Sequence, residues 1–406
     1  MADLRPFRGI RPPKELVQQI VAPPYDVVTA EEARAYAQGN PRSFFGISRP
    51  EVNLPLGTDE HADAVYLQGR KTLEAFIAEG WLRQDEKPCF YLYRLHMGSH
   101  VQTGIVASAS VAEYDAKLIK KHELTRADKE YDRTWHVDVL GANDEPVLLF
   151  CRSSLALDTL VEEGTRGAPE YDFTTEDGIG HTFWMVRGAL NAALEEVFRA
   201  VPALYIADGH HRSAAASRVY ALRSQRGEGG RHDRFLAVVF PHHQMQILEY
   251  NRVLKDLCGL TPAELLQRLA AHFEVVRGAR KKPDRVRGFG MYLGGGAWYQ
   301  LTAKPEVFER MPEGVLDVTV LQRHVLEPLL GIEDPRKDTR IHFVGGIRGV
   351  EELERLVDSG AWAVAFSLYP TSLEQLMAIS DAGDIMPPKS TWFEPKLRSG
   401  LVLHLF

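Results

Sequence analysis

Residues 204–217, LYIADGHHRSAAAS, limit the possible folds of this chain more than any other stretch. Residues 204–207 are apolar, which predicts a short buried strand, and residues 213–223 are rich in alanine, which favours a helix. An acid, a glycine, two histidines and an arginine fill the interval, so no long loop fits there. We therefore expect a strand that turns sharply into a helix, whose first backbone N–H groups have no partners within the helix.

The turn between this strand and this helix has the chemistry of an anion site. Unpaired N–H groups, the positive end of the helix dipole and the guanidinium of Arg212 together suit a bound phosphate. Gly209 permits a tight turn or a close approach of a ligand to the backbone. Asp-Gly is also common in ordinary turns, and paired histidines can cap a helix or face solvent, so a purely structural turn is the alternative.

Composition and charge narrow the class of protein. A chain of 406 residues, 45% hydrophobic and 25% charged, predicts two or three packed globular units. The net charge of −7 argues against a nucleic-acid-binding surface. Cys89, Cys151 and Cys258 form no CxxC pair, which fits a reducing compartment and disfavours a disulfide framework or structural zinc. The N-terminus lacks the apolar core of a signal peptide and no apolar run suits a membrane helix, so we expect a cytoplasmic protein with no membrane partner.

Strand and helix patterns alternate along the chain and predict an α/β protein with some α+β character. We expect an N-terminal region packed on the core over residues 1–87, and a core with an insertion over residues 88–257. A C-terminal α/β unit is expected over residues 258–406, with its tail, residues 384–396, returning to the site. Strands are expected at residues 89–95, 104–111, 146–152, 181–186 and 235–240, and helices at residues 63–80, 190–200, 319–330, 350–358 and 372–379.

Other polar stretches are further candidates for a functional site. Residues 120–126, KKHELTR, precede more charges, a pattern that also suits a solvated helix face. Residues 388–391, PKST, form a loop braced by prolines that can bind an anion, although such loops are common. Polar residues in braced early loops are candidates for a substrate pocket, with a plain structural turn as the alternative: Tyr25, Asp26, Arg42 and Ser43.

Taken in order, the stretches at residues 122–123, 208–212 and 389–391 resemble motifs of the free-serine kinases, which belong to the ParB/sulfiredoxin-like superfamily. The whole chain also resembles the bacterial domain-of-unknown-function family numbered 1015. That family has an early Pro-Pro-Tyr-Asp and a central Asp-Gly-His-His-Arg, matched here by residues 23–26 and 208–212. The resemblance implies a ParB/sulfiredoxin-like core.

The resemblance also implies a role for each matching residue. Glu123 matches the catalytic glutamate of the kinases, which is the general base for the serine hydroxyl. The nucleotide-phosphate motif corresponds to Asp208, Gly209, His210, His211 and Arg212, of which Asp208, His211 and Arg212 are also expected to be catalytic. Ser213 is a further phosphate-binding candidate because it continues the backbone donors at the start of the helix. Substrate contacts are expected from His122, Lys389, Ser390 and Thr391, joined by the early candidates Tyr25, Asp26 and Ser43.

Two departures from the kinases bear on the substrate more than on the phosphate site. The interval from Glu123 to Asp208 is longer than in the stand-alone kinases, which indicates an insertion between base and phosphate loop. The late loop continues with Trp392 where the kinases have an arginine.

The function that follows from the resemblance is nucleotide-dependent phosphorylation of a small hydroxyl compound, with free L-serine and its product O-phosphoserine as the first choice. ADP or ATP is the expected donor. Mg²⁺ is expected to be held mainly by nucleotide oxygens, with Asp208 as a candidate ligand. Phosphoryl transfer depends on positioning and charge neutralisation, which a carboxylate base, backbone donors and an arginine supply. The hypothesis requires Glu123, Arg212 and Lys389 to converge on one cleft.

Other functions fit the sequence less well. Sulfiredoxin chemistry needs a cysteine beside the phosphate loop, and a DNA-partition protein needs a DNA-binding module that the acidic composition opposes. A non-catalytic sensor of nucleotides or phosphometabolites needs the phosphate loop but not Glu123. A metal hydrolase has no HxH or HExxH spacing to support it, and its ligands would come from His122, His136, His181, His210 and His211.

Overall fold

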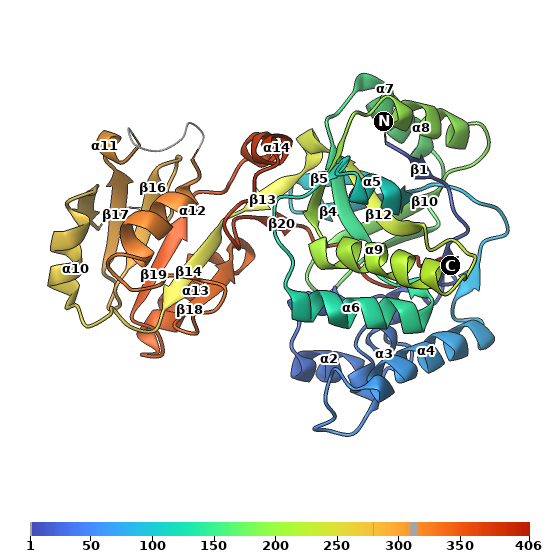
Figure 1. Cartoon of the computed structure of the whole chain (residues 1–406), viewed down its shortest axis with the longest axis horizontal. Helices are drawn as coiled ribbons and strands as arrows, with labels where there is room; N and C mark the ends of the chain where they lie inside the picture. Colours follow the sequence, from blue (N-terminus) through green and yellow to red (C-terminus); the bar gives the residue numbers. More distant parts are fainter. Residues whose placement is uncertain (1, 279, 309–314) are drawn as a thin grey trace. The chain divides into compact units, whose positions relative to one another are not determined.

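The computed structural model of the chain describes residues 2–278, 280–308 and 315–406. These residues form two compact units (Figure 1): Met1–Met245 together with Pro395–Phe406, and Gln246–Glu394. The second unit thus begins before the boundary expected at residue 258, and the last residues of the chain belong to the first unit. Every helix in the described part of the chain is too short or too polar to span a lipid bilayer.

The first unit is built on one mixed sheet. Its strands are β1 (Leu4–Arg5), β4 (Tyr91–Met97), β5 (His100–Ser110), β6 (Ile119–Lys120), β8 (Val147–Cys151), β9 (Tyr171–Thr174), β10 (Gly180–Met185), β11 (Leu204–Asp208) and β12 (Arg234–Pro241). They follow the order β6-β11-β8-β12-β5-β4-β10-β9, with β1 paired to β5. β8 and β12 are buried over most of their length, which explains why their sequences are almost wholly apolar. The strands expected from the sequence in this region are confirmed.

The pairing of β11 positions the site. β11 runs antiparallel to β8 on one side and parallel to the short strand β6 on the other, where Leu204 pairs with Ile119 and Tyr205 with Lys120. The carboxyl ends of parallel neighbours meet at the same edge of a sheet. The residues that follow Lys120 and those that follow Asp208 therefore emerge side by side.

Helices cover this sheet in two groups. α9 (His210–Gln225) follows β11 after one residue, α6 (Ala127–Leu140) packs against α9, and α4 (Asp63–Ala78) packs against α6 (Figure 1). α7 (Leu155–Gly164) and α8 (Leu190–Arg199) pack on each other, and their apolar residues join a core cluster with β5, β8, β11 and β12. The other elements of the unit are α1 (Val17–Ile20), η1 (Tyr25–Val27), α2 (Ala30–Ala37), α3 (Phe45–Ser48), η2 (Pro50–Asn53), α5 (Val111–Asp115), η3 (His242–Gln244), and the pairs β2 (Ile10–Arg11) with β3 (Arg83–Gln84) and β7 (Ala142–Asn143) with β21 (His404–Leu405).

The second unit has an antiparallel sheet in the order β15-β17-β16-β19-β14-β18. Its strands are β14 (Tyr250–Leu254), β15 (Phe273–Arg277), β16 (Gly288–Tyr292), β17 (Trp298–Ala303), β18 (Ile341–Gly345) and β19 (Val364–Leu368), and a separate pair joins β13 (Gln246–Leu248) to β20 (Trp392–Glu394). Its helices are α10 (Pro262–Leu269), α11 (Pro305–Phe308), α12 (Asp317–Leu321), η5 (Gly346–Arg348), α13 (Gly349–Asp358) and α14 (Leu373–Ala382). The α-helix expected at residues 319–330 is wrong beyond Leu321, because the chain continues there as the π-helical turn η4 (Gln322–Leu326). The chain is thus a mixed α/β protein, as predicted.

Candidate functional site

The parallel pairing of β6 with β11 brings two remote parts of the chain together. His122 and Glu123 follow β6, and His210 follows β11 across Gly209. One ligand atom from each of these three residues lies within 4.8 Å of the others. Glu123 therefore lies beside His210, the first helical residue after Gly209, and its convergence with Arg212 and Lys389 on one cleft stays a prediction.

Gly209 makes the sharp turn from strand to helix. Its φ of +96° lies in the left-handed region, where residues with a Cβ are strained. A Cβ built there would stand 3.0 Å from Nε of Arg212 and 3.3 Å from Cα of Val147. The glycine thus permits both the turn and the close packing of Arg212 beneath it.

Replacing Gly209 by alanine is expected to lower the free energy of unfolding by about 1–3 kcal/mol, because the backbone is strained and the Cβ crowds Arg212. Chemical denaturation measures this loss. Gly229→Ala is the matched control, since a Cβ at Gly229 meets no atom within 4 Å among the described residues and its φ lies outside the strained region. Equal stabilities of the two variants would contradict the strained turn.

Asp208 is an anchor for cations. Its Oδ1 accepts a hydrogen bond from the Gly209 N–H at 2.8 Å, and its Oδ2 accepts one from Nζ of Lys396 at 3.1 Å. Burial alone would raise the pKa of Asp208, but Lys396 and Arg212 hold the pKa below its ordinary value. Because both oxygens already have such partners, the carboxylate fits the role of orienting Lys396 better than that of a direct Mg²⁺ ligand.

Arg212 lies beneath the turn, where its guanidinium is buried among carboxylates. It donates a short hydrogen bond to the carbonyl of Pro146, and it lies 3.8 Å from Oδ1 of Asp208 and 4.0 Å from Oδ2 of Asp26. Burial lowers the pKa of Arg212, but the neighbouring carboxylates outweigh burial and raise the pKa above its usual value. Arg212 is therefore a permanent positive charge at the start of α9.

The histidines beside Glu123 are buried and neutral. The rings of His122 and His210 meet edge to face with centroids 4.5 Å apart, and the two residues are only 2% and 7% exposed. Burial lowers the pKa of His122 to about 4 and that of His210 well below its ordinary value. His211 is half-buried, and its Nε2 accepts a hydrogen bond from the Arg126 N–H at 3.1 Å. His211 thus connects the start of α9 to the segment that follows Glu123.

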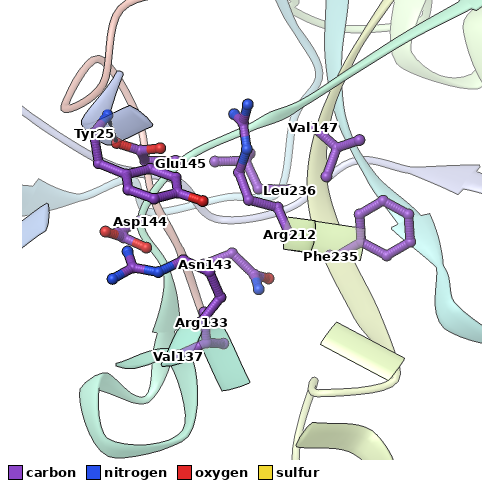
Figure 2. A pocket seen from close by; sticks show the side chains of 10 residues that line it. All are labelled: Tyr25, Arg133, Val137, Asn143, Asp144, Glu145, Val147, Arg212, Phe235 and Leu236. Carbon is purple, nitrogen blue, oxygen red and sulfur yellow. Dashed lines mark hydrogen bonds between the residues drawn. The ribbon is translucent and has the colours of Figure 1, made fainter. Parts of the chain in front are cut away.

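Figure 2 shows a small cavity beside Arg212 that both charged and apolar side chains line. Its volume of about 10 Å³ is room for roughly one water molecule. Glu145 is 5% exposed there, and its Oε1 accepts hydrogen bonds from the Tyr25 N–H at 3.0 Å and from Oγ of Ser399 at 2.8 Å. Among the described residues its Oε2 has no hydrogen-bond partner. Burial, reinforced by Asp144 and opposed by Arg212, raises the pKa of Glu145 to about 8.

Glu145 is expected to make stability fall with rising pH. A carboxyl whose pKa is raised in the folded state binds its proton more tightly when the chain is folded. Its contribution to the free energy of unfolding is therefore fully present below the ordinary pKa of 4.5, and it is lost as the pH rises to about 8. Glu145→Gln removes this dependence. The stability of the variant relative to the parent should therefore increase by roughly 2–4 kcal/mol between pH 5 and pH 9, as measured by denaturation at each pH.

The exposed Glu163 on α7 supplies the matched control for this pH series, because Glu163→Gln makes the same substitution at the surface. A stability difference between Glu145→Gln and the parent that does not change with pH would contradict the raised pKa of Glu145.

The early-loop candidates divide into two pairs. Tyr25 and Asp26 lie at the site, since Asp26 faces Arg212 and the guanidinium of Arg133 lies 4.2 Å from the centroid of the Tyr25 ring. Arg42 instead bonds Oε1 of Gln19 and lies over the ring of Trp81, and Ser43 is buried in the same turn. These contacts favour a structural role for Arg42, whereas among the described residues the buried Oγ of Ser43 has no hydrogen-bond partner, and Ser43 stays a candidate.

Three further expectations are affected by the contacts observed. Both donors of Ser213 point into the helix, because its N–H bonds the Gly209 carbonyl and its hydroxyl bonds the Gly209 and His210 carbonyls, contrary to the prediction that Ser213 binds phosphate. His136 is bonded to Asp144, and His181 to Tyr93 and Thr175, so neither joins the histidines beside Glu123.

The late loop belongs to the second unit. Lys389 has a φ of +58°, its carbonyl accepts a hydrogen bond from the buried Arg252 at 2.9 Å, and its Nζ lies over the ring of Tyr250. Ser390 donates to the Pro387 carbonyl at 2.6 Å. The loop is therefore held by its own unit, and the convergence of Lys389, Ser390 and Thr391 with Glu123 stays a prediction.

Sequence reasoning missed three charged residues of the site: Glu145, Lys396 and Arg133. Lys396 and Glu145 are single charges outside any recognisable motif. Two of the three lie close in sequence to residues that were candidates. Lys396 ends the tail that was expected to return to the site, and Arg133 ends the charged stretch after Glu123.

Comparison with known proteins yields one family and several distant structures. A family model described as "Protein of unknown function (DUF1015)" matches residues 4–320. No curated protein matches the sequence.

Among solved structures, a conserved hypothetical protein from Pyrococcus furiosus is 15% identical, with 73% of this chain and 95% of that chain covered and a TM-score of 0.35. A free serine kinase in complex with AMP is 14% identical, with coverage of 73% and 92% and a TM-score of 0.36. C-terminally truncated SbnI from Staphylococcus aureus is 12% identical, with coverage of 74% and 87% and a TM-score of 0.41. At these identities and scores we infer neither fold nor function from the matches.

Proposed function

The chain belongs to the DUF1015 family, and we propose that it transfers a phosphoryl group from an adenine nucleotide to a small hydroxyl compound, with free L-serine as the first candidate. The ParB/sulfiredoxin-like core and the cytoplasmic location expected from the sequence are part of this proposal. One observation carries it: Glu123 lies within 4.8 Å of His210, at the N-terminus of a helix that begins with Arg212 in its first turn.

The start of α9 supports binding of the nucleotide phosphates. The N–H groups of His210, His211 and Arg212 occupy the first turn, where helices have no internal acceptors for them and where the helix dipole is positive. Arg212 and Lys396 add two cations on either side of Asp208. A phosphate that approaches this turn therefore meets backbone donors and positive charge together.

Glu123 supports the chemical step. In the proposed reaction its carboxylate accepts the proton of the substrate hydroxyl as that oxygen attacks the terminal phosphorus of the donor. The bond from this phosphorus to the bridging oxygen breaks, so ADP leaves as AMP or ATP leaves as ADP, and the proton remains on Glu123 until solvent removes it. Arg212 and the N–H groups of α9 offset the negative charge on the transferred group. Mg²⁺ would neutralise the donor and be held mainly by phosphate oxygens, since the described contacts of Asp208 leave it poorly suited to direct ligation.

The proposal is tested by incubating the full chain with Mg²⁺, either ADP or ATP, and a panel of hydroxy amino acids. Mass spectrometry reads phosphate transfer, and calorimetry measures nucleotide binding in parallel. We expect a phosphorylated product, most of all O-phosphoserine. Nucleotide binding without transfer to any compound would favour the rival proposal of a non-catalytic sensor, and absence of nucleotide binding would contradict both.

A further inference from the structure

We propose that His122, Glu123 and His210 form a binding site for a divalent transition-metal ion, and that a bound ion inhibits the chain. The metal site itself stands on the geometry of these residues alone. Its inhibitory effect rests on the proposed function, because it depends on Glu123 acting as a base.

The three residues offer the donor set of an open metal site. Two imidazole nitrogens and one carboxylate oxygen lie within 4.8 Å of one another. Donors bound to zinc at about 2.0–2.2 Å in a tetrahedron stand roughly 3.3–3.5 Å apart, so side-chain shifts of about an ångström bring them to bonding distance. Three protein ligands leave a fourth position for water or for an anion.

The two histidines are buried beside each other. Their rings meet edge to face with centroids 4.5 Å apart, and both residues are less than a tenth exposed. His210 is only 7% exposed, yet among the described residues its Nε2 has no hydrogen-bond partner. A buried polar atom of this kind normally has one, and a metal ion would supply it.

The His122 ring is held by a contact with the backbone, as histidine ligands in metal sites commonly are. The backbone of Ile206 on β11 forms a hydrogen bond with the His122 ring. In metal sites the second ring nitrogen of a ligating histidine commonly donates to a backbone carbonyl, which fixes the tautomer and the orientation of the ring. Around His210, Asp208 adds a negative charge and Lys121 a positive one.

The donor set selects transition metals over magnesium. Mg²⁺ prefers oxygen ligands and retains several waters, whereas imidazole suits zinc and its neighbours. An ion at this site takes the carboxylate of Glu123 as a ligand, so that carboxylate can no longer accept the substrate proton. Zinc is therefore expected to slow phosphoryl transfer at concentrations that fill the site.

Calorimetric titration of the full chain with ZnCl₂ and with MgCl₂ tests the site, and Co²⁺ absorption reports the coordination directly. We expect one zinc ion to bind at least tenfold more tightly than magnesium, and tetrahedral cobalt bands to appear. His210→Gln should weaken zinc binding at least tenfold, and the exposed His243→Gln should leave it unchanged. If circular dichroism shows that His210→Gln is misfolded, Glu123→Gln replaces it with the same expected loss.

Zinc that binds the parent and these variants equally, or no more tightly than magnesium, would overturn the site. Because these readouts need no activity, they stand even if phosphoryl transfer is never observed. Where transfer is observed, zinc that fills the site without slowing it would overturn the inhibition.

Discussion

Replacing Glu123 by glutamine is expected to lower the rate of phosphoryl transfer by roughly 10²–10⁴-fold while the affinity for the nucleotide changes little. The amide keeps the size of the side chain but cannot accept the hydroxyl proton. The nucleotide phosphates are expected at the start of α9, where backbone N–H groups and Arg212 supply the contacts and Glu123 supplies none. The effect should therefore fall on the chemical step alone.

Single-turnover rates and nucleotide dissociation constants, measured on the same preparation, separate these two effects. Glu163→Gln is the matched control, since Glu163 is an exposed glutamate on α7 and its replacement should leave both quantities at the parent values. A Glu123→Gln variant that transfers phosphate at the parent rate would remove Glu123 from the mechanism.

Arg212→Met is expected to abolish measurable nucleotide binding and to lower the free energy of unfolding by about 3–5 kcal/mol. The buried guanidinium offsets the charges of Asp208 and Asp26 and satisfies the Pro146 carbonyl. Methionine fills a similar volume but removes the charge, so among the described residues Asp208 keeps only Lys396 as a cationic partner and the Pro146 carbonyl loses its donor. Stability and phosphate binding should therefore be lost together.

Arg218 supplies the control for this prediction because it lies on the same helix. It is about half exposed and pairs with Glu130, so Arg218→Met should cost less than about 1 kcal/mol. Urea denaturation of both variants measures the free energy of unfolding, and calorimetry measures their affinity for the nucleotide. If Arg212→Met were as stable as Arg218→Met and bound the nucleotide as tightly as the parent, Arg212 would neither stabilise the fold nor bind phosphate.

The strand, turn and helix around Gly209 could be predicted because neighbouring residues determine each of them. An apolar run, a glycine that can adopt positive φ and an alanine-rich stretch are local signals. The helix begins at His210, earlier than its alanine-rich part, because the turn at Gly209 is completed within one residue. Local chemistry thus specifies the platform of the site.

The approach of Glu123 to His210 could not be derived from the residues themselves. It depends on the parallel pairing of β6, which is only Ile119–Lys120 and carries no periodic pattern of its own. The resemblance to the free-serine kinases supplied that expectation instead. Lys396 and Glu145 were missed for the same reason, since contacts between residues far apart in the chain place them beside Arg212 and Asp208.

The unit boundary was expected too late in the chain. Thr261 begins α10 with a capping box just after the expected boundary, so a clear helix start stands there inside one unit. The second unit begins instead with β13 and β14, and β14 pairs with β18 and β19, strands that lie much later in the chain. A boundary set by such pairing has no mark in the adjacent sequence.

A crystal structure of the full chain with ADP and Mg²⁺ would test the central claim most directly. We predict phosphate oxygens within hydrogen-bond distance of the first N–H groups of α9, close to Arg212, with the terminal phosphate facing the carboxylate of Glu123. A nucleotide bound elsewhere, or one that lies on α9 with its terminal phosphate directed away from Glu123, would contradict the assignment of this edge of the sheet as the reacting centre.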